Sequence, residues 1–172
     1  MEVVKGPDII HETQFDHLVA AYQTALLRMC YVCLKDRAMA EDAVQETYLK
    51  AYKSIENFRG ECSEKSWLMK IAINTCRDMQ RSGWFKHMDR RITPELLVEK
   101  SVVPREDDSS LAIEMMGLPS KLQEVLLLYY YQGMTIAEVG KILGISKVTV
   151  SHRLKQAKER LRGALKGGDL RD

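Results

Sequence analysis

The chain has 172 residues, of which 45% are hydrophobic and 29% charged, a balance typical of a globular protein with room for one or two small domains. No uninterrupted apolar run approaches the roughly 20 residues that cross a bilayer, and the first residues lack the charged-then-apolar pattern of a signal peptide. We therefore expect a cytoplasmic protein that does not insert into a membrane.

The net charge of +2 hides an uneven distribution. Residues 93–114 carry six acidic and two basic side chains, whereas residues 147–166 carry seven basic and one acidic. A basic cluster of this kind suits the neutralisation of phosphates. It predicts a nucleic-acid partner for the C-terminal part of the chain.

The four cysteines raise the question of a metal or redox site. Cys30 and Cys33 have C-x-x-C spacing, but they fall within an expected helix, and neither a second pair nor a nearby histidine completes a tetrahedral zinc set. Cys62 and Cys76 are single. We interpret the thiols as ordinary small core side chains and expect no metal and no cofactor.

Helical periodicity dominates the N-terminal half. It predicts a helix over about 13–35, a second over 38–55 and a third over 64–82, the second and third joined by a loop that contains Gly60. Three polar side chains gather near the start of the second helix: Asp42, Gln45 and Glu46. Acids there are favoured by the helix dipole, which is a sufficient structural reason for them.

The stretch 83–109 has the composition of a flexible acidic linker, with two prolines and the acidic run 106–108. At most one helical turn is expected in it, near 95–100. A short helix over about 110–116 should follow. Ser120 is then expected to cap a helix over 121–132 that is apolar on most sides and must be buried on several of them.

Residues 135–162 are typical of a helix-turn-helix. Thr135 and Glu138 have the spacing of a capping box, Gly144 should end the first helix, and Ser146 should cap the second. Val150, Leu154, Ala157 and Leu161 would form the buried stripe of that second helix. The outer face would then carry small polar and cationic side chains suited to reading DNA in a major groove: Lys147, Thr149, Ser151, His152, Arg153, Lys155, Gln156 and Lys158.

The solvated face of an ordinary helical bundle would also explain such a basic helix. The order of the segments, however, resembles the bacterial RNA polymerase sigma factors of the extracytoplasmic-function group, within the sigma-70 family. Four passages carry this resemblance: AEDAVQETYLKAY, then NFRGECSEKSWLMKIAINTCRD, then LPSKLQEVLLLYYYQGMTIAEVGKILGISKVTVSHRLKQAKERLR, and the acidic linker that joins the two halves. It implies an all-α fold of two small helical domains, at 1–82 and 110–172, joined by the linker 83–109.

The resemblance also implies roles for individual residues. Asp42, Gln45 and Glu46 would dock on the clamp of the largest polymerase subunit, and the C-terminal domain would read the minus-thirty-five element as duplex DNA while lying against the polymerase flap. The loop and third helix would capture a base of the minus-ten element. The residues implied in that capture are Phe58, Arg59, Gly60, Cys62, Lys65, Lys70, Asn74, Arg77 and Arg81.

The implied partners are core RNA polymerase, promoter DNA and an anti-sigma factor, in a stress or envelope response, and the chain would have no active site of its own. Trp67 is expected in the core, so the third helix lacks exposed aromatic side chains for strand separation. Two other functions stay open: a helix-turn-helix regulator or recombinase that does not replace the sigma subunit, and a polymerase-binding module that does not read DNA.

Overall fold

We analysed a computed structural model that describes residues 7–82 and 113–164. Within these ranges every regular element is a helix, so the fold is all-α as predicted. The elements in chain order are α1 (Pro7–Leu34), α2 (Arg37–Ser54), the 3-10 turn η1 (Ile55–Asn57), α3 (Glu64–Arg81), α6 (Ser120–Leu126), the π-helical turn η3 (Leu127–Tyr131), α7 (Ile136–Leu143) and α8 (Lys147–Ala164). The predicted linker and the turn near 95–100 lie outside the described residues.

The N-terminal helices begin and end close to where the sequence predicts, with one difference. α1 begins at Pro7 rather than near residue 13, because proline is compatible with the first turn of a helix. It ends at a left-handed Lys35 (φ 60°). Asp36 then caps α2 by accepting a hydrogen bond from the Met39 amide at 2.8 Å.

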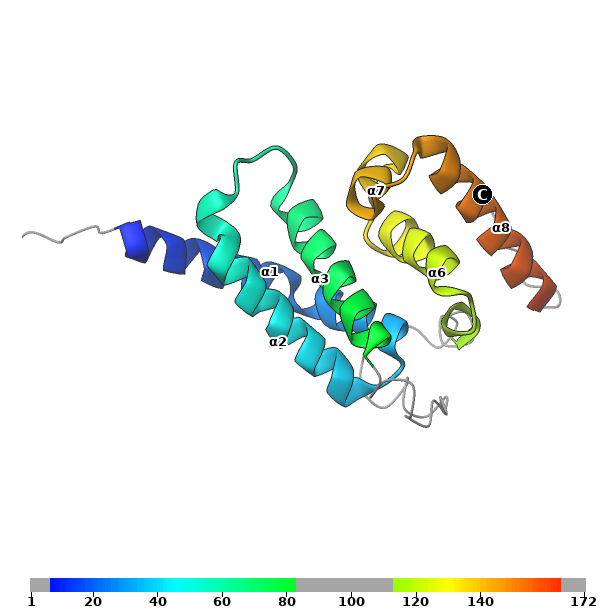
Figure 1. Cartoon of the computed structure of the whole chain (residues 1–172), viewed down its shortest axis with the longest axis horizontal. Coiled ribbons are helices and arrows are strands. Elements are labelled where there is room, and N and C mark those ends of the chain that lie inside the picture. Colours follow the sequence, from blue (N-terminus) through cyan, green and yellow to red (C-terminus); the bar gives the residue numbers. More distant parts are fainter. Residues whose placement is uncertain (1–6, 83–112, 165–172) are drawn as a thin grey trace, which may run out of the picture.

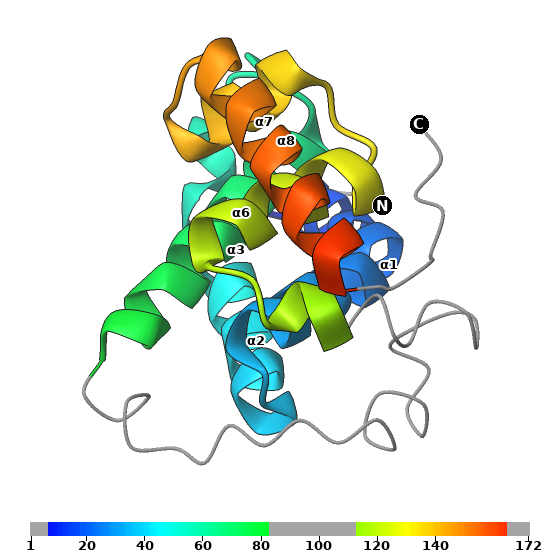
Figure 2. The ribbon, with the colours of Figure 1, turned by 90° about the vertical axis from the view of Figure 1, so that its right-hand side faces the viewer.

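α1, α2 and α3 pack against one another and bury the predicted apolar faces (Figure 1). Fully buried side chains come from all three helices, and the largest include Leu26, Met29, Met39, Leu68 and Ile73. Figure 2 views the molecule from the end at which α8 lies. The outward sides of α2 and α3 are exposed.

The C-terminal helices depart from the prediction at two points. Ser120 is not an N-cap: α6 begins with Ser120 inside the helix, because the Pro119 carbonyl already accepts hydrogen bonds from the amides of Leu122 and Gln123. The expected single helix over 121–132 also widens into the π-helical η3, where the Gln132 amide donates to the Leu127 carbonyl. Gly133, at a φ of +66°, then turns the chain towards α7.

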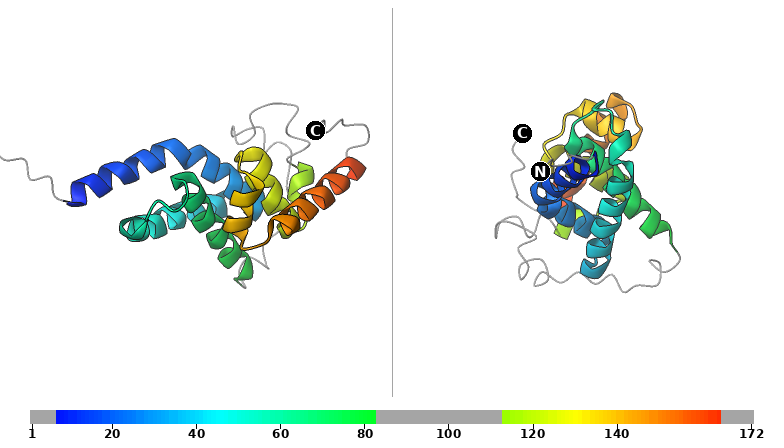
Figure 3. Two further views of the ribbon diagram at one scale, coloured as in Figure 1. Left: turned by 90° about the horizontal axis from the view of Figure 1, so that it is seen from above. Right: turned by 90° about the vertical axis from the view of Figure 1, so that its left-hand side faces the viewer.

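The two halves are not separate in this structure. One continuous cluster of buried apolar side chains runs through α1, α2 and α3 and on into α6, α7 and α8. α6 contacts α1, and α7 contacts α3, whereas α8 packs on α6 and α7 at the far end of the molecule (Figure 3). The buried Gln123 side chain joins the halves by donating to the Val32 carbonyl at 3.2 Å and to the Met115 carbonyl at 3.1 Å.

Candidate nucleic-acid interface

The turn between α7 and α8 has the geometry of a helix-turn-helix. Thr135 and Glu138 form the predicted capping box, with the Thr135 amide donating to Glu138 at 2.8 Å. These hydrogen bonds hold the pKa of the Glu138 carboxyl below its ordinary value. Gly144 ends α7 in the left-handed region at a φ of +68°. At the start of α8 the Ser146 hydroxyl oxygen accepts a hydrogen bond from the Thr149 amide.

The turn also requires a glycine at position 140. A Cβ built on it would lie 2.8 Å from the Ile145 carbonyl oxygen and 3.7 Å from a methyl carbon of Val150. The Ile145 amide donates to the Gly140 carbonyl at 3.0 Å, so the two backbones are already in contact. Only a residue without a side chain allows α7 and the turn to approach this closely.

The outer face of α8 is accessible. Ser151, His152, Lys155 and Gln156 are exposed, while Val150, Leu154, Ala157 and Leu161 form the buried stripe as predicted. Of the flanking cations, Lys147 is exposed and Arg153 is half-buried. The ammonium of Lys158 lies 5.3 Å from the centre of the Tyr130 ring. Thr149 lies partly within the N-terminal cap, since its hydroxyl is 2.8 Å from that of Ser146.

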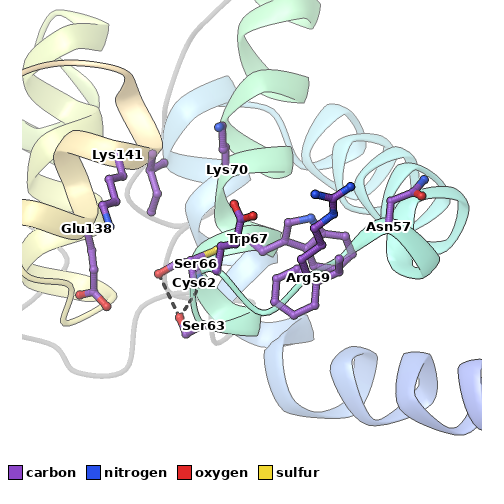
Figure 4. A pocket seen from close by; sticks show the side chains of 12 residues that line it. Asn57, Arg59, Cys62, Ser63, Ser66, Trp67, Lys70, Glu138 and Lys141 are labelled. Carbon is purple, nitrogen blue, oxygen red and sulfur yellow. Dashed lines mark hydrogen bonds between the residues drawn. The ribbon is translucent and has the colours of Figure 1, made fainter.

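A cleft of about 790 Å³ opens between the loop before α3 and helix α7 (Figure 4). The loop turns at Gly60, which has a φ of +71°. The floor carries the half-buried Trp67, whose ring lies 4.9 Å from that of Phe58, so this tryptophan is only partly in the core. Arg59, Cys62 and Lys70 line the same side.

The opposite side of the cleft belongs to the C-terminal half, which contributes Glu138, Lys141 and Ile142 of α7. Figure 4 shows Lys141 and Glu138 across from Trp67 and Arg59. The structure thus brings part of the predicted minus-ten set together and places it opposite the first helix of the helix-turn-helix.

Two further cations of that set are bonded to the C-terminal half. Arg77 makes a bidentate ion pair with Glu124 of α6, at 2.8 Å from Nε to Oε1 and 2.7 Å from Nη2 to Oε2. This hydrogen bonding raises the pKa of the Arg77 guanidinium. Lys65 donates from Nζ to the Gln132 carbonyl at 2.7 Å. Asn74 and Arg81 stay exposed, and Arg81 pairs with Asp78 at 3.1 Å.

Glu124 and Gln132 were not predicted as contributors to this surface. Both are buried polar side chains, and a buried charge requires a partner. The sequence did hold one signal: a helix that is apolar on most sides must be buried, so the polar residues within it need bonds to other elements. No pattern in the neighbouring sequence identified Arg77 as the partner of Glu124.

The polar side chains near the start of α2 are exposed. Asp42, Gln45 and Glu46 point away from the core, on the same helix face as the exposed Leu49 and Tyr52. Glu46 pairs with Lys50 at 3.3 Å. An exposed face that continues from acids into large apolar side chains is typical of a protein interface.

The cysteines behave as core residues with one exception. Cys30, Cys33 and Cys76 are buried, and Cys62 is exposed in the loop. A hydrogen bond with Cys76, together with burial, raises the pKa of the Cys33 thiol well above its usual value, which makes it unreactive. Within residues 7–82 and 113–164, no group of three or more histidine, cysteine or acidic side chains could hold a metal ion.

Family models match both halves of the chain. The model for sigma-70 region 2 matches residues 18–85, and the model for sigma-70 region 4 matches residues 115–163. The chain belongs to the sigma-70 family. The first match contains α2, the loop and α3, and the second contains the whole helix-turn-helix, so both candidate DNA surfaces of this sigma-70 family member lie within matched regions.

Relatives narrow the assignment to the extracytoplasmic-function (ECF) group. The chain is 28% identical over 169 residues to the ECF RNA polymerase sigma factor SigW of Bacillus subtilis, covering 88% of this chain and 89% of that protein. It is 29% identical over 164 residues to a probable RNA polymerase sigma factor, RfaY, of Xanthomonas campestris, covering 88% of this chain but only 40% of that protein.

Solved structures share the fold. The sigma factor RpoE of Bartonella quintana, in complex with the anti-sigma factor NepR, superposes with a TM-score of 0.72 at 21% identity, covering 91% of this chain and 99% of that chain. CnrH, in complex with the cytosolic domain of CnrY, gives a TM-score of 0.71 at 23% identity, covering 92% and 91%. No helix in the described part of this sigma-70 family member is long and apolar enough to span a membrane.

Proposed function

We propose that this chain is an ECF sigma factor that binds core RNA polymerase in the cytoplasm and directs transcription initiation at specific promoters. The observation that carries the proposal is the pairing of two matched regions, each with its own basic surface, on one chain. A regulator that reads DNA alone needs the helix-turn-helix but not the region that contains α2 and α3.

Each surface has a role in this proposal. The exposed side chains of α8 read the minus-thirty-five element as duplex, with Ser151, His152, Lys155 and Gln156 facing base edges and the flanking cations holding phosphates. The loop and α3 take the minus-ten element, where extracting a base costs a few kcal/mol. The acids of α2 dock on the polymerase clamp.

The protein supplies recognition and no chemistry of its own. Among the described residues, the titratable side chains with shifted pKa values are capping, ion-paired or core groups, and none forms an acid and base pair in a cleft. Because one of the superposed solved structures is of a sigma factor in complex with an anti-sigma factor, an anti-sigma factor is also the proposed regulator here.

Reconstitution tests the proposal. The purified chain is mixed with bacterial core polymerase and a library of promoter fragments, and run-off transcripts and retained fragments are sequenced. Specific initiation is expected, and a shared pair of sequence elements should emerge. A chain that binds duplex DNA but never retains polymerase would instead be a regulator, and one that retains polymerase without selecting fragments would be an interaction module.

A matched pair of variants tests the docking face. Glu46→Lys should weaken polymerase binding because it reverses a charge on the exposed face of α2. Glu12→Gln removes an exposed acid from α1 and should leave binding unchanged. Equal affinity of Glu46→Lys and the parent in a pull-down at two salt concentrations would mean that the acids of α2 serve only the helix dipole.

A further inference from the structure

The recognition helix α8 carries an apolar side chain on its outer face. Val148, in the first turn of α8, is 79% exposed, more than any other large apolar side chain among the described residues. It lies two positions before the fully buried Val150, and two positions on a helix are about 200° apart. The valine therefore points away from the core, on the side of the exposed Ser151, His152 and Lys155.

The stability of the helix does not favour valine at this position. A β-branched side chain loses rotamer freedom in a helix, and an exposed one gains no burial in return, so alanine or lysine would suit the position better. The stiffness of valine suits binding instead, because its two methyl groups keep one orientation and lose little freedom when a ligand covers them. The side chain is thus better suited to contact a partner than to stabilise the fold.

The surroundings of Val148 match the edge of a DNA duplex. A single exposed apolar side chain is common on protein surfaces, so its neighbours decide what it can bind. With Ile136 and Tyr129 it lines a groove of about 680 Å³ between α8 and the start of α7. Lys147 and Ser151 line the same groove and add a cation and a hydroxyl to the apolar side chains. Because these groups suit phosphates and base edges, a duplex lying along α8 would fill the groove and shield the valine from water.

A valine in a major groove recognises the methyl group of thymine. Each base pair presents its own pattern of hydrogen-bond donors and acceptors there, and thymine adds an apolar C5 methyl group to that pattern. Contact between this methyl group and the valine buries apolar surface on both sides, which is favourable. A donor or acceptor covered by the valine would lose its hydrogen bond to water, which costs free energy. The side chain therefore favours thymine over a base that directs a polar group at it.

We infer that Val148 is a specificity-determining residue, which selects one or two thymines of the minus-thirty-five element by contact with their methyl groups. The polar side chains of α8 then read the neighbouring base pairs. The helix cap fixes the valine in place, because the Ser146 hydroxyl oxygen accepts a hydrogen bond from the Thr149 amide at 3.1 Å and so holds the first turn. This inference rests on the proposed function for the identity of the DNA element.

Removal of the methyl group from the DNA tests the inference without changing any hydrogen-bonding group. The full chain in complex with core polymerase first selects promoter fragments, as in the reconstitution. Each thymine in the upstream element of a selected fragment is then replaced by uracil, which lacks the C5 methyl group and keeps the same donors and acceptors. The affinity of the holoenzyme for each duplex is measured by titration.

The parent and Val148→Ala should respond differently to these duplexes. Uracil at one or two positions should weaken binding of the parent about three- to five-fold, the worth of one buried methyl group, and 5-bromouracil, whose bromine is similar in size to a methyl group, should restore it. Val148→Ala should bind the thymine duplex more weakly by a similar factor and no longer distinguish thymine from uracil. The salt dependence of binding should stay the same, because valine neutralises no phosphate. Circular dichroism should show full helicity, since the side chain is exposed and alanine favours a helix.

His152→Ala is the matched control, because it removes an exposed side chain from the same face of α8. It should weaken binding but keep the distinction between thymine and uracil. Loss of the distinction in this variant would overturn the inference, because the effect would then belong to the whole helix face.

Two further results would also overturn the inference. One is a parent holoenzyme that binds every uracil duplex as tightly as the thymine duplex. The other is a Val148→Ala holoenzyme that still distinguishes the two, since the effect of uracil would then lie in the DNA itself. A holoenzyme that selects no fragment at all is a different result: it refutes the proposed function, and the inference fails with it.

Discussion

Gly140 offers a sharp test of how the helix-turn-helix is packed. In most helix interiors, replacing glycine by alanine stabilises the protein by about 1 kcal/mol. Here the new Cβ would meet the Ile145 carbonyl oxygen at 2.8 Å. Overpacking of this kind costs about 1–3 kcal/mol, and the oxygen cannot withdraw freely, because the amide of the same residue is hydrogen-bonded to Gly140. We expect Gly140→Ala to destabilise the chain by about 1–2 kcal/mol net.

Gly163 in α8 is the matched control. A Cβ built there meets nothing within 4 Å, and the residue is exposed. Gly163→Ala should therefore stabilise by about 0.5–1 kcal/mol, the ordinary gain for a helix.

Urea unfolding followed by circular dichroism measures both variants, with the slope of the transition compared to confirm that only stability has changed. Duplex binding gives a second readout, because any displacement of the turn by the new Cβ of Gly140→Ala moves the recognition helix. If Gly140→Ala were stabilised as much as Gly163→Ala, the close approach of the two backbones would be wrong, and with it the positioning of α8.

Four further outcomes are expected. The first is measured by titrating duplex promoter variants at several salt concentrations. Gln156→Ala should lose discrimination at one or two base pairs, worth roughly 1–3 kcal/mol, whereas Arg153→Ala should weaken binding to all sequences and flatten the salt dependence of that binding. The reverse pattern would mean that the recognition helix α8 is oriented differently. Thr135→Ala should cost about 1 kcal/mol in unfolding experiments. Because the pKa of Glu138 is lowered in the folded state, its contribution is complete above the ordinary value of 4.5 and is lost as pH falls through the lowered pKa, so a Glu138→Gln variant should differ from the parent at neutral pH and converge with it in acid. A thiol reagent should modify one cysteine quickly in the native chain, and Cys62→Ser should abolish that reaction; rapid modification of further thiols would contradict their burial.

The sequence by itself determined the local structure of this chain. Helical periodicity, the capping box at Thr135 and Glu138 and the turn at Gly144 depend on residues a few positions apart, and each is present as predicted. The outer face of α8 followed for the same reason, since a helix fixes which side chains share a side. The errors were also local: proline replaced Ser120 as the cap, and the chain widened into a π-helical turn before Gly133.

Only the tertiary structure decided how the two halves meet. Arg77 and Glu124 are 47 positions apart, and neither has a neighbour in sequence that identifies the other. Composition and periodicity predicted two helical parts on a linker, and the family resemblance implied that Arg77 is a cation that contacts DNA. Gly140 was likewise unremarkable, because the carbonyl that excludes a Cβ belongs to the following turn. The burial of a charge and the contact between two backbones depend on how segments far apart in the sequence pack together. The spacing of residues along one segment therefore cannot predict them.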